Sequence, residues 1–169
     1  MNQAPYADWV LSVWPREGCR VSLLVILKLI HVLAAITAVG ANLTYTYWMR
    51  YAGQDRDRLI WTMKGIRRLD NFIATPAYVV LLITGVLMVI GGVFSFQTGW
   101  IVAAIALYVV VVVIGIAFYA PALKRQIAEA EADATSPAYA VAARRSNLFG
   151  ISTTAVVLVI VVLMVTKPF

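Results

Sequence analysis

VSLLVILKLIHVLAA, residues 21–35, is an apolar stretch interrupted by Lys28 and by His31, which is the only histidine of the chain. Apolar residues continue to about residue 47, and roughly 18–20 of them in a row suffice to cross the hydrocarbon core of a bilayer. The stretch therefore predicts a membrane-spanning helix. Because ionisable groups are costly in hydrocarbon, Lys28 and His31 are the first candidates for a functional site.

The composition extends this prediction to the whole chain. Its 169 residues are 62% hydrophobic and 13% charged, whereas soluble domains are nearer half apolar and a quarter charged. Four stretches have the length and composition of membrane spans, at about residues 21–47, 72–93, 100–121 and 148–166. The predicted fold class is all-α, a polytopic membrane protein whose four transmembrane helices form one bundle within residues 21–169.

Most of the basic residues lie in two of the loops between these spans. The loop 94–99 has no charge, and the charged loops contain Arg50, Arg56, Arg58, Lys64, Arg67, Arg68, Lys124, Arg125, Arg144 and Arg145. The positive-inside rule places these loops in the cytoplasm and both termini on the outer, periplasmic side of a bacterial cytoplasmic (inner) membrane. The net charge of +6 therefore does not indicate a nucleic-acid partner. The expected partners are the lipid bilayer and other membrane subunits or a second copy of the chain.

The segment 1–20 precedes the first span. Tyr6, Trp9, Val10, Val13 and Trp14 recur in it at helical spacing, and tryptophan and tyrosine favour the membrane interface. We expect an interfacial helix that anchors the chain, with a lid over an outward-opening site as the alternative. Cys19 is the only cysteine, so an intrachain disulfide is excluded.

Two loop segments also have helical patterns. Leu59, Ile60, Met63 and Ile66 share one face, which predicts an amphipathic helix on the membrane surface, with its basic residues available to lipid phosphates. In the third loop, residues 123–134 read as a continuation of the third helix.

The starts of the second and fourth helices carry capping signals. Ser136 followed by Pro137 is typical of a helix N-terminus that leads into the fourth span. Asp70, followed by Asn71, is interpreted as the cap of the second span, because a carboxylate there satisfies free backbone amides. The alternative role for Asp70 is an ion pair with Arg67 or Arg50.

The first span carries a polar stripe. Lys28, His31, Ala35, Ala38 and Asn42 follow the spacing of one helix face, and polar groups in membranes face the bundle interior. Lys28 is near enough to the outer end of the span to extend to the interface instead.

Depth along the helices suggests partners for this stripe. At about 1.5 Å of rise per residue, Thr84, Gly85 and Tyr108 lie level with His31, and Met88 lies near the level of Lys28.

Three roles of His31 remain open. It is a structural residue hydrogen-bonded to Tyr108, Thr84 or a backbone carbonyl, or an axial ligand of haem iron, or part of a proton relay or metal-ion site with Tyr108 and Asn42. A haem would need a second ligand from Met88, Lys28, water or another chain, because no second histidine exists in this one.

The motifs resemble a known family. Lys28-Leu29-Ile30-His31, Gly40-Ala41-Asn42, Arg68-x-Asp70 and Pro76…Thr84-Gly85 are similar to an uncharacterised bacterial integral-membrane family, domain of unknown function 2269. The first helix is distantly similar to bacterial copper-resistance membrane proteins and to the membrane protoporphyrinogen oxidase. These resemblances imply a helical bundle with haem or copper binding through the first-helix histidine, and the family name itself implies no activity.

Two functions are expected from these observations. The first is a non-catalytic integral membrane subunit or assembly factor of a larger respiratory or photosynthetic type of complex, favoured by the small extramembrane mass and by the valine-rich face of residues 156–165. The alternative is a small haem-binding membrane oxidoreductase or haem-handling protein that uses His31. Whether the chain is an enzyme stays open, although it lacks a phosphate-binding glycine loop and any CxxC motif.

Overall fold

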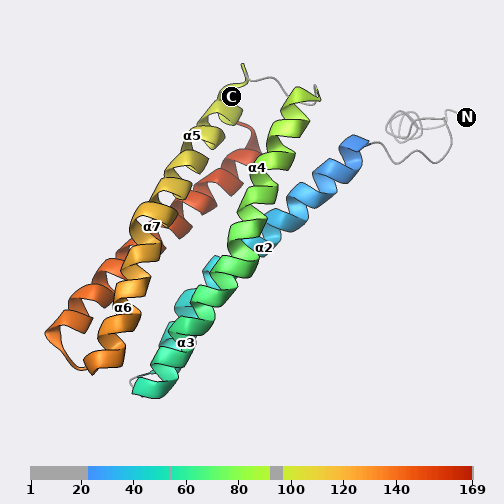
Figure 1. Ribbon diagram of the computed structural model, residues 1–169. Helices are drawn as coiled ribbons and strands as arrows, with labels where there is room; N and C mark the ends of the chain where they lie inside the picture. Colours follow the sequence, from blue (N-terminus) through green and yellow to red (C-terminus); the bar gives the residue numbers. More distant parts are fainter. Residues whose placement is uncertain (1–22, 54, 92–96, 169) are drawn as a thin grey trace, which may run out of the picture.

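The computed structural model describes residues 23–53, 55–91 and 97–168, in which all regular secondary structure is helical (Figure 1). Four helices there are long and apolar enough to cross a membrane: Leu23–Ala52 and Pro137–Thr166 with 30 residues each, and Arg56–Ile90 and Gly99–Asp133 with 35 each. All four are longer than the apolar stretches from which they were predicted. The predicted interfacial helix of residues 1–20 lies outside the described residues.

Both 35-residue helices contain a short π-helical segment. The first consists of α3 (Arg56–Leu69), η1 (Asp70–Ala74) and α4 (Thr75–Ile90), and the second of α5 (Gly99–Val113), η2 (Ile114–Tyr119) and α6 (Ala120–Asp133). Pro76 and Pro121 each follow a π segment by two residues. Proline has no backbone N–H and its ring clashes with the carbonyl four residues earlier. A π segment at that turn accommodates this clash, so the helix continues instead of ending.

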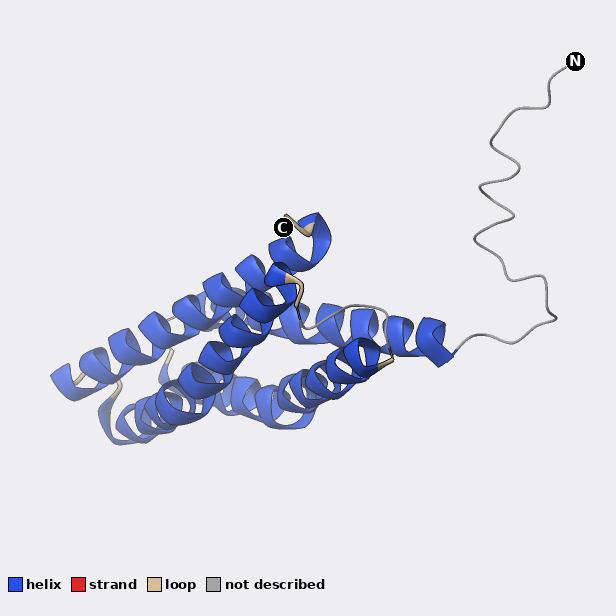
Figure 2. Cartoon of the chain, turned by 90° about the horizontal axis from the view of Figure 1, so that it is seen from above, coloured by secondary structure: helices blue, strands red, loops and turns tan. Residues whose placement is uncertain are grey.

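The helices form two hairpins that lie side by side (Figures 1 and 2). In the first, α2 (Leu23–Ala52) packs along α3 and α4, and in the second, α7 (Pro137–Thr166) packs along α5 and α6. The hairpins meet where α3 contacts α6 and where α2 contacts α7. The end that carries the α2–α3 and α6–α7 turns contains most of the basic residues and is called the basic end below. The opposite end carries the α4–α5 connection.

The main cluster of large buried side chains lies at the basic end. On α3, Leu59, Met63 and Ile66 are buried, and they belong to one cluster with Leu123 and Ile127 of α6. This arrangement corrects the predicted surface helix: α3 is continuous with α4, and its apolar face packs against protein. One apolar face and one polar face are expected both for a helix on the membrane surface and for a helix packed on another helix. Here the partner is α6, which has an apolar face of its own.

The predicted start of the fourth helix is confirmed. The Ser136 hydroxyl accepts a hydrogen bond of 3.1 Å from the Tyr139 backbone N–H, and Pro137 is the first residue of α7. The continuation of the third helix through α6 is also confirmed. A further cap was not predicted: the Asp55 carboxylate accepts a 2.8 Å hydrogen bond from the Arg58 backbone N–H at the start of α3.

The predicted cap role of Asp70 is wrong. Asp70 lies inside a continuous helix, and its own backbone N–H bonds to the carbonyls of Ile66 and Arg67. Backbone amides in mid-helix already have partners, so there is nothing for a carboxylate to cap. No ion pair between Asp70 and Arg67 or Arg50 occurs among the residues that the structure describes.

Candidate functional site

His31 points from α2 toward α4 and is hydrogen-bonded there. Its Nδ1 lies 2.8 Å from the Thr84 hydroxyl oxygen, and this hydroxyl donates its proton to the Val80 carbonyl at 2.6 Å. Because a threonine hydroxyl has a single proton, its oxygen accepts from His31 Nδ1–H. The Leu81 carbonyl is a further acceptor near the ring. The sequence prediction that places Thr84 at the level of His31 therefore agrees with this contact.

Small residues allow α2 and α4 to approach closely around His31. Ala34 and Ala38 of α2 and Ala77 of α4 are buried. A Cβ atom added at Gly85 would lie only 3.3 Å from the His31 Cε1 atom. The backbone of α4 thus contacts the edge of the imidazole ring, and a side chain at position 85 would displace it. Close approach through small residues is the usual packing of helices in membranes.

A second set of hydrogen bonds links three helices. The Asn42 side-chain amide of α2 donates to the Tyr78 hydroxyl of α4 at 2.6 Å, and the Tyr108 hydroxyl of α5 donates to the Tyr78 carbonyl at 2.7 Å. The rings of Tyr78 and Tyr108 also meet edge to face, with centroids 6.4 Å apart. Tyr108 was predicted as a partner of His31, and its hydroxyl instead joins the two hairpins through Tyr78.

Closer to the basic end, Asp70 lies near three tyrosines. Tyr45 of α2, Tyr78 of α4 and Tyr119 of η2 interact electrostatically with its carboxylate. Tyr45 is buried, and the Asp70 carboxylate is the hydrogen-bond acceptor near its hydroxyl. The sequence reasoning missed all three tyrosines. A usable signal was present for Tyr45, which follows Asn42 by three residues and so continues the polar stripe of α2.

The remaining candidates are separate from this contact. Lys28 is exposed on the surface of α2. Met88 is 8% exposed and lies one turn beyond Thr84 on the same face of α4. Among the described residues, no group of three or more histidine, cysteine, aspartate or glutamate side chains is arranged to hold a metal ion. Because His31 is the only histidine of the chain, it is the one imidazole that could bind a metal ion. Its Nδ1 atom is already hydrogen-bonded to Thr84.

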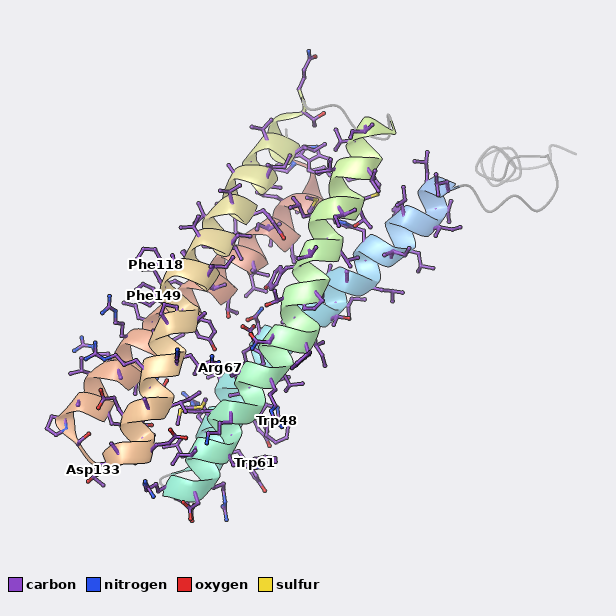
Figure 3. All side chains as sticks on the ribbon, viewed as in Figure 1. Trp48, Trp61, Arg67, Phe118, Asp133 and Phe149 are labelled. Atoms are coloured by element: carbon purple, nitrogen blue, oxygen red, sulfur yellow. The ribbon has the colours of Figure 1, made fainter. Side chains whose placement is uncertain are left out.

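Two grooves open at the basic end. The larger, of about 430 Å³, lies between α3–η1 and α6, and we call it the α3–α6 groove. Its lining residues are Lys64, Arg67, Arg68, Asn71, Lys124, Ile127, Ala128 and Glu131. The side of α3 that carries Arg67 faces the second hairpin, whereas Trp48 and Trp61 project from the outer side of the first hairpin (Figure 3). A smaller groove of about 310 Å³ lies between α6 and α7.

Comparison with known proteins gives one result that covers nearly the whole chain. A family described as "Predicted integral membrane protein (DUF2269)" matches residues 25–168. No curated protein and no solved structure matches the chain.

Proposed function

The chain belongs to the DUF2269 family of predicted integral membrane proteins, and on that premise we propose that this multi-pass membrane protein is a non-catalytic subunit or assembly factor of a larger membrane complex. The proposal rests on the way the polar side chains within the spans are paired with one another. His31 with Thr84, and Asn42 with Tyr78, form interhelical hydrogen bonds within the bundle. Such pairs hold helices together in lipid.

The proposed orientation follows from the charges and aromatic side chains. The basic end faces the cytoplasm, and both termini lie on the periplasmic side of a bacterial inner membrane. The side chains of Trp48 and Trp61 are 44% and 77% exposed, and tryptophan favours the membrane–water interface. They support the proposal that the basic end lies at the level of the lipid headgroups.

The surface offered to a partner is the valine-rich side of α7. Val159, Val162 and Val165 are 50%, 57% and 76% exposed and follow one another at three-residue spacing. A partner helix packed on this side would be displaced by a larger side chain, whereas lipid chains would adapt to it.

The test is the native size of the full chain extracted from its own membrane in a mild detergent. We expect a stable assembly larger than a homodimer, and we expect Val162→Trp to release the chain from it. Val79→Trp is the matched control, since Val79 of α4 is similarly exposed, at 50%, and α4 makes no contact with α7. A chain that runs as a monomer or homodimer would contradict the proposal.

A haem-handling role is the second candidate, and one contact favours it. Ligating histidines commonly hold one ring nitrogen in a hydrogen bond that fixes the ring and raises its basicity, and Thr84 holds Nδ1 of His31 in this way. The other ring nitrogen would bind the iron, with Met88 as a second ligand of the same chain. Haem would supply electron-transfer chemistry. A Soret absorption band that disappears in His31→Ala would support this role.

A further inference from the structure

The α3–α6 groove is built from two facing stripes of side chains. Lys64, Arg67, Arg68 and Asn71 follow the spacing of one helical face on α3 and η1, and Lys124, Ile127, Ala128 and Glu131 repeat the same spacing on α6. The two helices run in opposite directions (Figure 1). Because Lys64 meets Glu131, Asn71 at the other end of the first stripe lies level with Lys124. Each end of the groove therefore has its own pair of residues.

The acidic residue of the groove is already paired. The Lys64 Nζ lies 2.6 Å from a Glu131 carboxylate oxygen. The Arg56 guanidinium secures the same turn of α6 by donating to the backbone carbonyls of Ala130 and Glu131. At the other end of the groove, no ion pair involving Arg67, Arg68 or Lys124 occurs among the described residues.

The end with the unpaired cations is the one nearest the apolar spans. Directly after Asn71, the side chain of Phe72 is 78% exposed, and Ile73 is also exposed. An anion held by Arg67, Arg68 and Lys124 would therefore sit where the polar surface of the helix pair gives way to an apolar surface. A phospholipid matches this arrangement, because its charged phosphate is joined to apolar acyl chains that can pack against the exposed apolar side chains.

We propose that the α3–α6 groove binds the phosphate of an anionic phospholipid through Arg67, Arg68 and Lys124. Arginine binds phosphate oxygens with two parallel N–H donors, and basic pockets between membrane helices select anionic headgroups. The Asn71 amide supplies a neutral donor at the same level. The exposed apolar side chains of η1 contact the acyl chains, which distinguishes a lipid from free phosphate as the occupant.

The experiment uses the full chain purified in a neutral detergent. Its melting temperature is followed by tryptophan fluorescence while phosphatidylglycerol, phosphatidylcholine or inorganic phosphate is added. We expect a saturable rise with phosphatidylglycerol only. An equal rise with inorganic phosphate at similar concentration would show a free-anion site and overturn the lipid assignment, and an equal rise with phosphatidylcholine would remove the requirement for an anionic headgroup.

Charge-matched variants locate the site. Arg67→Gln/Arg68→Gln/Lys124→Gln is expected to raise the half-saturating phosphatidylglycerol concentration at least about tenfold, since each basic residue contributes to headgroup attraction. The control Arg50→Gln/Arg58→Gln/Arg144→Gln removes the same charge from exposed positions outside both grooves. An equal loss in the control would show diffuse attraction and contradict a site.

Two single variants keep the test decisive if the triple variant does not fold. Arg68→Gln changes one exposed side chain and is expected to weaken binding about fivefold. Glu131→Gln frees Lys64 from its ion pair and so adds a cation to the groove. It is expected to strengthen phosphatidylglycerol binding, and unchanged binding in both single variants would contradict the proposal.

Discussion

At the basic end, Leu59, Met63 and Ile66 of α3 are buried against Leu123 and Ile127 of α6, whereas around His31 the buried residues are mostly alanines and single polar groups. The first region resembles the core of a soluble helical protein, held by large apolar side chains and supported by ion pairs. The second is typical of helices in lipid, where small residues and interhelical hydrogen bonds replace the hydrophobic effect. One chain thus uses two kinds of packing along the length of the same helices.

The difference shows where the two hairpins are joined most firmly. Contact between α3 and α6 brings both hairpins together at the basic end, and Arg56 adds hydrogen bonds to the last carbonyls of α6. In the membrane-spanning half, the Tyr108–Tyr78 hydrogen bond is a polar link between the hairpins. We therefore expect substitutions at the basic end to have larger effects on the free energy of unfolding.

The largest effect is expected for Met63→Ala. Met63 is fully buried in the α3–α6 cluster, and truncation of a buried large side chain costs about 2–5 kcal/mol. Unfolding by denaturant in mixed micelles, followed by helical ellipticity, measures the change. Trp61→Ala is the control on the same helix, because Trp61 is 77% exposed. An equal loss in both variants would show that the cluster does not hold this end together.

Arg56→Ala is expected to lose less, about 1 kcal/mol, in the same assay, because the side chain is half exposed and its charge is partly screened. The stabilisation comes from donation to the carbonyls at the C-terminus of α6, where positive charge is favoured. Arg58→Ala removes an exposed arginine two residues away and is expected to change little. A larger loss for Arg58→Ala would show that general charge at this end matters more than the contact with α6.

The close approach of α4 to His31 is tested by two glycine substitutions. Gly→Ala within a helix adds up to about 1 kcal/mol of stability through helix propensity. A methyl group at Gly40 meets no atom within 4 Å, whereas one at Gly85 would lie 3.3 Å from His31 Cε1. Gly40→Ala is therefore expected to be more stable than Gly85→Ala by about 1 kcal/mol. Equal stability of the two variants would contradict the close packing of α4 on the ring.

The smallest effect is expected from the His31–Thr84 hydrogen bond itself. A double-mutant cycle with His31→Ala and Thr84→Val is expected to give a coupling of about 0.6 kcal/mol, the average for polar pairs between membrane helices. Thr37→Val replaces Thr84→Val in the control cycle, because the Thr37 hydroxyl donates its hydrogen bond to the Leu33 carbonyl of its own helix. Zero coupling between His31 and Thr84 would remove the structural role assigned to this contact.

The sequence predicted the helical class and the span-sized apolar stretches because hydropathy reflects the cost of burying polar groups in lipid. It also predicted Ser136 as a cap, which depends only on neighbours along the chain. Asp70 was misassigned because the polar pair Asp70-Asn71 and Pro76 come just before an apolar run. The same pattern is typical of the start of a helix. Only the η1 segment before Pro76 shows that the helix continues.

For the candidate site, depth along the helices was enough to match His31 with Thr84, because rise per residue is nearly constant. Depth alone did not distinguish Tyr108 from Thr84 as the partner of His31. The rotation of each helix about its own axis decides which side chain at a given depth faces the histidine. The Tyr45, Tyr78 and Asp70 neighbourhood was missed for the same reason. These residues come from different elements, and only their packing brings them together.

The most direct test of the proposed non-catalytic role is the absorption spectrum of the full chain purified from its native membrane after expression with a supply of haem. With His31 hydrogen-bonded to Thr84 as a structural contact between α2 and α4, we predict no Soret band and the same spectrum for the protein and for His31→Ala. A Soret band at stoichiometric intensity that disappears in His31→Ala would contradict this account and establish His31 as a haem ligand.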